Sequence, residues 1–265
     1  MYMNEDFNFK RSDLLNEFFA EEYITSEDVN IMDYYAFGHE LGHLFGLILA
    51  ELSGYKLATA NYIIIEKKEQ KIFTERDDFK PLNKTYSCFD LYNEKNMCYD
   101  EDDEKRLSSK LNDINKSLYY FSYLLLGGIF HLSIYSDKPT TEHFDYCYTD
   151  DELNIDYNGI YGRAGNDWSK LKRLASLKQW KLVELKNLRS DIYHFLQSTQ
   201  IFVHLKPKIV GLYQELKIKQ KIEGYDLIKI EGKLKEIFIE LPEFAPNYHY
   251  MIIQKYFRIL EHQKF

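Results

Sequence analysis

The stretch "YYAFGHELGHLFGLILAELSG", residues 34–54, carries His39, Glu40 and His43 in an otherwise apolar run. Its apolar residues recur as on a buried helix. Side chains four residues apart share a helical face and lie about 6 Å apart along the axis, so both imidazoles can approach one ion. A plain core helix with hydrogen-bonded histidines is the alternative, but burying Glu40 without a counter-charge is costly.

These three residues form the pattern HExxH, which is typical of zinc hydrolases. His39 and His43 supply two nitrogen ligands to Zn²⁺. Glu40, one step round the helix, can take a proton from a metal-bound water, whose pKa zinc lowers toward neutrality. The pattern therefore predicts a zinc site with Glu40 as general base. Replacement of the third histidine of the longer HExxHxxGxxH pattern by Leu49 leaves the third ligand open.

Small residues recur every four positions along the same segment: Gly38, Gly42, Gly46, Ala50 and Gly54. Glycine inside a helix costs roughly 1 kcal/mol relative to alanine. A row of glycines therefore predicts that another backbone approaches this face closely. Ordinary glycine usage without a packing role is the alternative interpretation.

The remaining chain predicts an α+β fold that is predominantly α-helical, with a small β-hairpin after the HExxH helix and a helical C-terminal part. The first of these elements are an amphipathic helix over 12–23, a helix over 33–53 and a hairpin over 55–77, with its turn at Lys67–Gln70. The C-terminal elements are helices over 167–188, 190–205 and 207–221, a strand pair near 225–240 and a last helix over 247–262.

A boundary near residue 165 divides the chain into residues 1–165, with the HExxH helix and hairpin, and a basic helical region, 166–265, packed on it. One continuous domain is the alternative. Residues 168–265 carry 18 Lys and Arg against 10 Asp and Glu, a net charge of +8, so −16 falls on the preceding part of a chain of net charge −8. The lysines recur among apolar positions, as on solvated helix faces, and no nucleic-acid-binding motif accompanies them. We therefore expect no nucleic-acid partner.

The chain has three cysteines without a CxxC spacing, and its start lacks the basic and then apolar regions of a signal peptide. Both features predict a cytoplasmic protein. Residues 118–135 have no formally charged side chain and just reach the length that spans a bilayer. Association with a membrane surface is compatible with this segment. The alternative is an integral membrane protein that crosses through residues 34–53 and 118–135.

The segment "HELGHLFGLILAELSGYKLATANYIIIEKKEQK", residues 39–71, resembles the motif helix and following hairpin of site-2-protease-like metallopeptidases. "LLGGIFHL", residues 125–132, resembles the GPxxN-like segment of that family, with Gly128 in place of proline and His131 in place of asparagine. "AGNDWSKL" resembles the motif that supplies the family's third zinc ligand, with Asp167 at the ligand position and tryptophan in place of the glycine that follows.

The resemblance implies a zinc peptidase that cuts a peptide or protein substrate in or near a membrane. It implies Glu40 as general base, His131 as a group that orients the substrate or oxyanion, and Asp167 as third zinc ligand. Each of the last two residues has an alternative role. His131 would be a helix histidine with a backbone partner, and Asp167 would be the N-cap of a helix over 168–188. The family's motif helices lie within the bilayer, whereas this chain has 29% charged residues and a mean hydropathy of −0.46. A non-catalytic, metal-stabilised interaction protein derived from a metallopeptidase is the second functional hypothesis.

Overall fold

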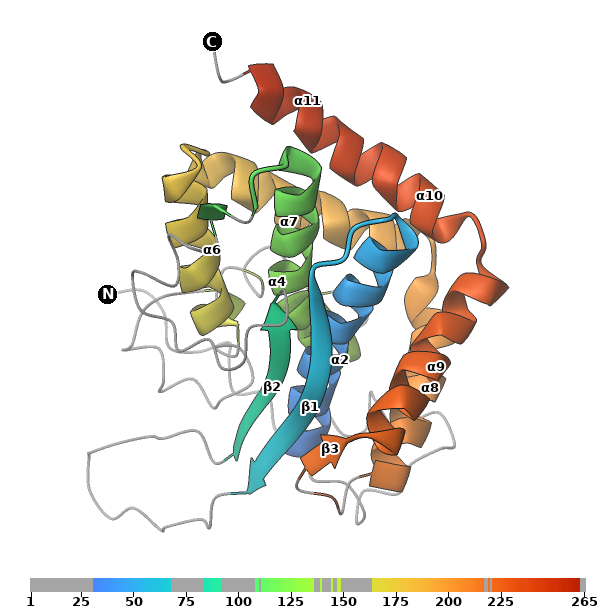
Figure 1. Ribbon diagram of the computed structural model, residues 1–265. Helices are drawn as coiled ribbons and strands as arrows, with labels where there is room; N and C mark the ends of the chain where they lie inside the picture. The colour runs from blue at the N-terminus through green and yellow to red at the C-terminus, as the bar shows by residue number, and fades with distance from the viewer. Residues whose placement is uncertain are drawn as a thin grey trace, which may run out of the picture.

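The computed structural model describes residues 31–67, 83–91, 108–109, 111–135, 139, 144, 147–148, 164–216, 219 and 221–262. Most of them are helical, as the composition of the segments predicts, and a small sheet lies beside the helices (Figure 1). In chain order the elements are α2 (Ile31–Leu52), β1 (Ala58–Lys67), β2 (Asn83–Leu91), α4 (Ile114–Tyr135), α6 (Gly165–Leu177), α7 (Leu182–Ser198), α8 (Ile201–Leu216), β3 (Lys221–Glu223), α9 (Tyr225–Glu240), α10 (Phe244–Tyr248), the π-helix η2 (His249–Ile253) and α11 (Gln254–His262).

Helices α2 and α4 pack closely against each other in the centre of the fold (Figure 1). A β-carbon added to Gly42 would lie 2.3 Å from the carbonyl oxygen of Leu126, and one added to Gly46 would lie 2.8 Å from the Cα of Tyr123. Because these distances are shorter than van der Waals contact, no larger residue fits at either position without backbone movement. The close backbone approach predicted from the glycine spacing is therefore confirmed.

Helix α2 ends at Leu52, one residue before the predicted end at residue 53. Gly54 has φ of +85°, a left-handed conformation that glycine adopts without steric cost. The amide of Gly54 bonds to the carbonyl of Glu51, and the amide of Tyr55 bonds to that of Ala50, at 2.9 and 2.8 Å. These bonds use carbonyls that the helix end would otherwise leave without partners.

The sheet has the strand order β2-β1-β3 with antiparallel pairing throughout. Strand β1 lies where the first half of the hairpin was predicted. The next strand in the chain, β2, pairs with β1, with Ile63 opposite Ser87. Because β2 begins at Asn83, the predicted turn at residues 67–70 does not lead directly into the paired strand. The predicted second run, residues 71–77, lies outside the described part of the chain, as does the predicted helix over 12–23.

The strand pair expected near residues 225–240 is wrong, because these residues form helix α9. Leu227, Ile230, Leu234 and Ile237 are buried and recur every three or four residues, which is the spacing of a helical stripe. Of the expected strands in this region, only the three residues of β3 are extended, where Ile222 pairs with Ile63.

Three helices follow residue 165 as predicted, but their boundaries differ. The chain turns at Gln179 and Gln200, which have φ of +59° and +53°, rather than near residues 189 and 206. Pro207 lies inside α8 and does not start a helix, although proline favours the first helical turn. The last predicted helix, 247–262, is present as the consecutive helices α10, η2 and α11.

One helix among the described residues, Ile114–Ile134, is long and apolar enough to cross a membrane, and 94% of its apolar window is buried inside the fold. Helix α2, which contains the other predicted segment, does not meet the same criterion. Because the core helix of a globular protein also meets it, the predicted membrane association has weak support.

Buried apolar side chains from both sides of residue 165 belong to one cluster, which includes Phe45, Leu126, Leu171, Ile192 and Leu234. The division into residues 1–165 and 166–265 stays a prediction. The cluster surrounds the part of α2 and α4 that carries the histidines.

Candidate metal centre

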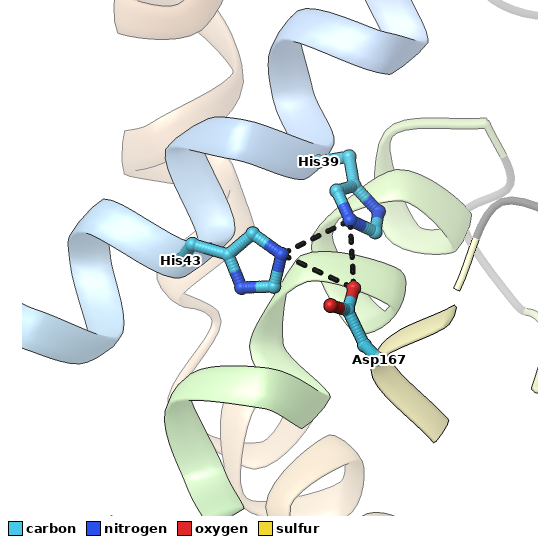
Figure 2. A group of neighbouring side chains, drawn as sticks. All are labelled: His39, His43 and Asp167. Carbon is cyan, nitrogen blue, oxygen red and sulfur yellow. Dashed lines mark hydrogen bonds and ion pairs between the residues drawn. The ribbon is translucent and has the colours of Figure 1, made fainter. Parts of the chain in front are cut away.

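Helix α2 directs the side chains of His39 and His43 toward the same point (Figure 2). Their Nε2 atoms lie 3.0 Å apart, and the ring centroids are 4.7 Å apart with the rings nearly perpendicular. The four-residue spacing places both imidazoles on the face of α2 that packs on α4. Both residues are buried, with 7% and 4% of their surfaces exposed.

Asp167 completes a group of three donor atoms. It is the third residue of α6, where the partial positive charge of a helix N-terminus stabilises a carboxylate. Its Oδ2 lies 3.1 Å from Nε2 of His39 and 3.2 Å from Nε2 of His43. Ala164 occupies the N-cap position of α6, so the N-cap alternative for Asp167 is wrong.

The three donor atoms are spaced as the ligands of a small cation are. Zinc bonds to nitrogen and oxygen are about 2.0–2.2 Å long, so two ligands of a tetrahedral ion lie roughly 3.3 Å apart. The observed separations are 3.0, 3.1 and 3.2 Å. Among the described side chains that can ligate metals, His39, His43 and Asp167 form the one such group.

Protons alone satisfy this group poorly. Nδ1 of His43 bonds to the Tyr123 carbonyl, so a neutral His43 brings a lone pair to the group at Nε2, and the Asp167 carboxylate also brings only lone pairs. A cation at the meeting point of the three donors would use the lone pairs of both Nε2 atoms and of Asp167 together. The residues therefore fit a divalent metal ion.

The backbone of α4 orients His43. Nδ1 of His43 donates a hydrogen bond of 2.9 Å to the carbonyl oxygen of Tyr123, and the two rings pack with centroids 4.8 Å apart. A histidine that donates from one ring nitrogen to a carbonyl presents its other nitrogen to a metal, as ligating histidines commonly do. The Tyr123 carbonyl thus selects Nε2 of His43 as the ligand atom.

Without an ion, a proton on His43 supplies the positive charge that faces the Asp167 carboxylate. Burial lowers the pKa of His43, but the Asp167 carboxylate, its hydrogen bond and the charge of Glu40 outweigh burial, so the pKa of His43 is raised above 6.5. Burial raises the pKa of Asp167, but the charge of His43 and the hydrogen bonds from both histidines hold it well below its ordinary value. A metal ion must displace the proton of His43 to bind.

Glu40 and His131 lie close to the three donors without joining them. Glu40 is 4% exposed, and its charge acts on His43. His131, on α4, is fully buried, and its ring centroid lies 6.4 Å from that of His39. His131 thus lies near the group formed by His39, His43 and Asp167, and Glu40 is buried on the helix that carries both histidines.

Gly127 is a site residue that the sequence analysis missed. A β-carbon at this position would lie 2.6 Å from Cε1 and 2.7 Å from Nε2 of His43, and 3.0 Å from Nε2 of His39. The neighbouring Gly128 instead faces the hydroxyl of Tyr148, which a β-carbon would approach to 2.5 Å. Two adjacent glycines in an apolar helix were the available signal, but only the structure distinguishes their environments.

Behind Asp167, a buried arginine packs among aromatic rings. The guanidinium of Arg189 lies 5.3 to 5.8 Å from the ring centroids of Phe144, Tyr148 and Trp168, and it donates a hydrogen bond of 3.3 Å to the Phe144 carbonyl. Trp168 directly follows Asp167, so this arrangement fixes the start of α6 against α7. Sequence reasoning missed Arg189, since an arginine in a basic helix is ordinarily solvated.

A cavity of about 620 Å³ lies away from this centre, between α7, η2 and α11. Its lining includes His194, Tyr250, Met251 and Arg258, and none of the three donor residues contributes to it. The donor residues are each at most 9% exposed. The candidate metal centre is thus enclosed in the described structure.

No family model, curated protein or solved structure matches this chain. The function proposed below therefore follows from the side chains themselves.

Proposed function

We propose that the chain is a zinc-dependent metallopeptidase in which His39, His43 and Asp167 hold the ion. The observation that carries this proposal is the convergence of two imidazole nitrogens and one carboxylate oxygen within 3.0 to 3.2 Å of one another. Three protein ligands leave a fourth position of tetrahedral zinc for water or substrate, which is the arrangement of catalytic zinc sites.

The side chains around the ion would divide the chemistry among them. Zinc, when bound, lowers the pKa of a coordinated water and polarises a peptide carbonyl. Glu40 accepts the proton of the attacking water and passes it to the leaving amine. His131 donates a hydrogen bond that orients the substrate or stabilises the oxyanion. The buried surroundings exclude bulk water and strengthen each of these electrostatic interactions.

The resemblance to site-2-protease-like metallopeptidases supports the same proposal, with the chain as a divergent relative acting on a peptide or protein substrate. The third ligand that this resemblance implies, Asp167, is the residue that meets His39 and His43 although 128 positions separate it from His39. We further propose that the protein is cytoplasmic or bound to a membrane surface, since the apolar window of α4 is used inside the fold.

A second candidate is a non-catalytic interaction protein in which the ion only stabilises the fold. The enclosure of the site favours it, because the donor residues and Glu40 are each at most 9% exposed. Structural zinc sites have four protein ligands, whereas catalytic sites keep a position for water. The number of protein ligands on bound zinc therefore separates the two candidates.

Metal analysis tests the shared basis of both candidates. We expect the purified chain to bind one zinc per molecule and His39→Ala to lose it. His204→Ala, which changes a half-exposed histidine paired with Glu240, should retain the zinc. A wild-type chain that takes up no zinc after dialysis against the metal would overturn both candidates.

Glu40→Gln then separates catalysis from structure. This variant removes the base and keeps both histidine ligands, so we expect stoichiometric zinc with no cleavage of a denatured protein or a fluorogenic peptide mixture that the wild type cleaves. Zinc-loaded wild type that cleaves neither probe would favour the non-catalytic candidate. Unchanged cleavage by Glu40→Gln would show that Glu40 is not the base.

A further inference from the structure

Two kinds of glycine lie at the contact between α2 and α4. At Gly42, on α2, an added β-carbon would collide with the backbone carbonyl group of Leu126, at 2.3 Å from its oxygen and 2.8 Å from its carbon. At Gly127, on α4, the nearest atoms are instead the ends of the His43 and His39 rings, at 2.6 to 3.0 Å. Backbone cannot give way without moving a helix, whereas an imidazole can rotate about its side-chain torsions.

We infer that Gly127 is the positioning residue that allows the two imidazoles to converge on one ion, whereas Gly42 serves the packing of the helices. This inference rests on the zinc site of the proposed function and adds a residue that determines its metal affinity. The bare Cα of Gly127 lets both Nε2 atoms lie directly against α4. In that placement the two Nε2 atoms lie 3.0 Å apart. Oδ2 of Asp167 lies 3.1 Å from Nε2 of His39 and 3.2 Å from Nε2 of His43.

A methyl group at position 127 would displace the ligand side chains rather than the helix backbones. Its contacts with the His43 ring would be about 0.7 Å or more inside ordinary van der Waals distance, so the ring must turn away. Turning His43 also weakens its hydrogen bond to the Tyr123 carbonyl, which fixes the ligand nitrogen. Metal ligands must lie within about 0.2 Å of their ideal distances, so displaced rings lose the ion.

The test compares three glycine-to-alanine variants of the full chain: Gly127→Ala, Gly42→Ala and Gly232→Ala. Gly232, inside α9, has open space at its β-carbon position and is the matched control. Two quantities are measured for each: zinc affinity by competition with a chromophoric chelator, and the thermal midpoint of the metal-free protein.

For Gly127→Ala we expect zinc affinity to fall by about 10- to 100-fold or more, with the metal-free midpoint within about 4 °C of wild type. For Gly42→Ala we expect the metal-free midpoint to fall by more than about 5 °C. Gly232→Ala should keep the zinc affinity and raise the midpoint slightly, because alanine favours helix.

Wild-type zinc affinity in Gly127→Ala overturns the inference and leaves the proposed function standing, whereas a wild-type chain without zinc overturns both. If Gly127→Ala unfolds, the double variant Gly127→Ala/His43→Ala decides. Removing the obstructing ring should restore the metal-free midpoint to that of His43→Ala alone, since the methyl group then has space. An equal loss of stability with and without the His43 ring would assign Gly127 to helix packing and contradict the inference.

Discussion

Nδ1 of His43 donates its hydrogen bond to the carbonyl of Tyr123 at the point where Gly46 brings α2 and α4 together. The β-carbon that Gly46 lacks would lie 2.8 Å from the Cα of Tyr123. Helix packing and orientation of a metal ligand therefore depend on the same contact between two backbones.

Gly46→Ala should destabilise the protein. The added methyl group must push the Tyr123 backbone away, which costs about 1–3 kcal/mol, and helix propensity returns roughly 1 kcal/mol, so we expect a net loss of up to about 2 kcal/mol. Denaturant titration of the metal-free protein measures the change. Gly211→Ala is the control, because Gly211 in α8 has open space and its replacement should stabilise the protein. Equal effects of the two changes would mean that α2 and α4 are not in close contact at Gly46.

Asp167→Asn should weaken zinc binding by about 10- to 100-fold, because it keeps the size of the side chain and removes the charge of the third ligand. Chelator competition measures the affinity. Asp226→Asn, in the first turn of α9 and paired with Lys219, removes a carboxylate remote from the histidines and should leave the affinity unchanged. If the two variants bind zinc equally well, Asp167 is not a ligand.

The stability of the metal-free protein should depend on pH through His43. Its pKa is raised in the folded state, so its protonation stabilises the fold fully below pH 6.5, and this contribution is lost as pH rises through the folded-state pKa. The contribution of His249 to stability depends on pH in the opposite direction, because burial lowers the pKa of His249. The difference in thermal midpoint between wild type and His43→Gln isolates the contribution of His43, and in chelator this difference should shrink from about pH 6 to pH 8.5.

Saturating zinc should reverse that trend, since the ion binds deprotonated imidazoles and gains affinity as pH rises. The stabilisation by zinc, measured as the midpoint with metal minus the midpoint in chelator, should increase over the same pH range. A stabilisation by zinc that is independent of pH would argue against histidine ligands.

Alkaline carbonate should release the protein from membranes. The apolar window of α4 is 94% buried among other parts of the chain, which leaves little of it to contact lipid. We expect the chain in the supernatant after washing a membrane fraction that contains it, with a protein of several spans retained in the pellet as control. Retention of the chain in the pellet would instead support the integral alternative.

Much of helix α2 could be predicted from sequence because its signals are local. The apolar run, the four-residue glycine spacing and Gly54 each act within one or two helical turns. His39 and His43 share a face for the same reason. Asp167 was found only through the resemblance of its surroundings, since no local rule connects residues 128 positions apart.

The missed features depend on contacts between distant segments. Local sequence does not specify that β1 pairs with β2, because the two strands are separated in the chain. The isoleucines of α9 favour strands through their β-branching, yet burial of a stripe at helical spacing makes the segment a helix. The roles of Gly127 and Arg189 depend on what lies opposite them after folding, which are imidazole ends in one case and aromatic rings in the other.

The meeting of His39 with Asp167 closes a loop in which 128 positions separate the two residues. A metal shared by both would be a reversible cross-link between helix α2 and the first turn of α6. Like a disulfide, it would lower the conformational entropy of the unfolded chain, and the loss of entropy grows only slowly with the length of the loop. The concentration of free zinc would then set how firmly α6 is held against α2, and with it the resistance of this region to proteolysis.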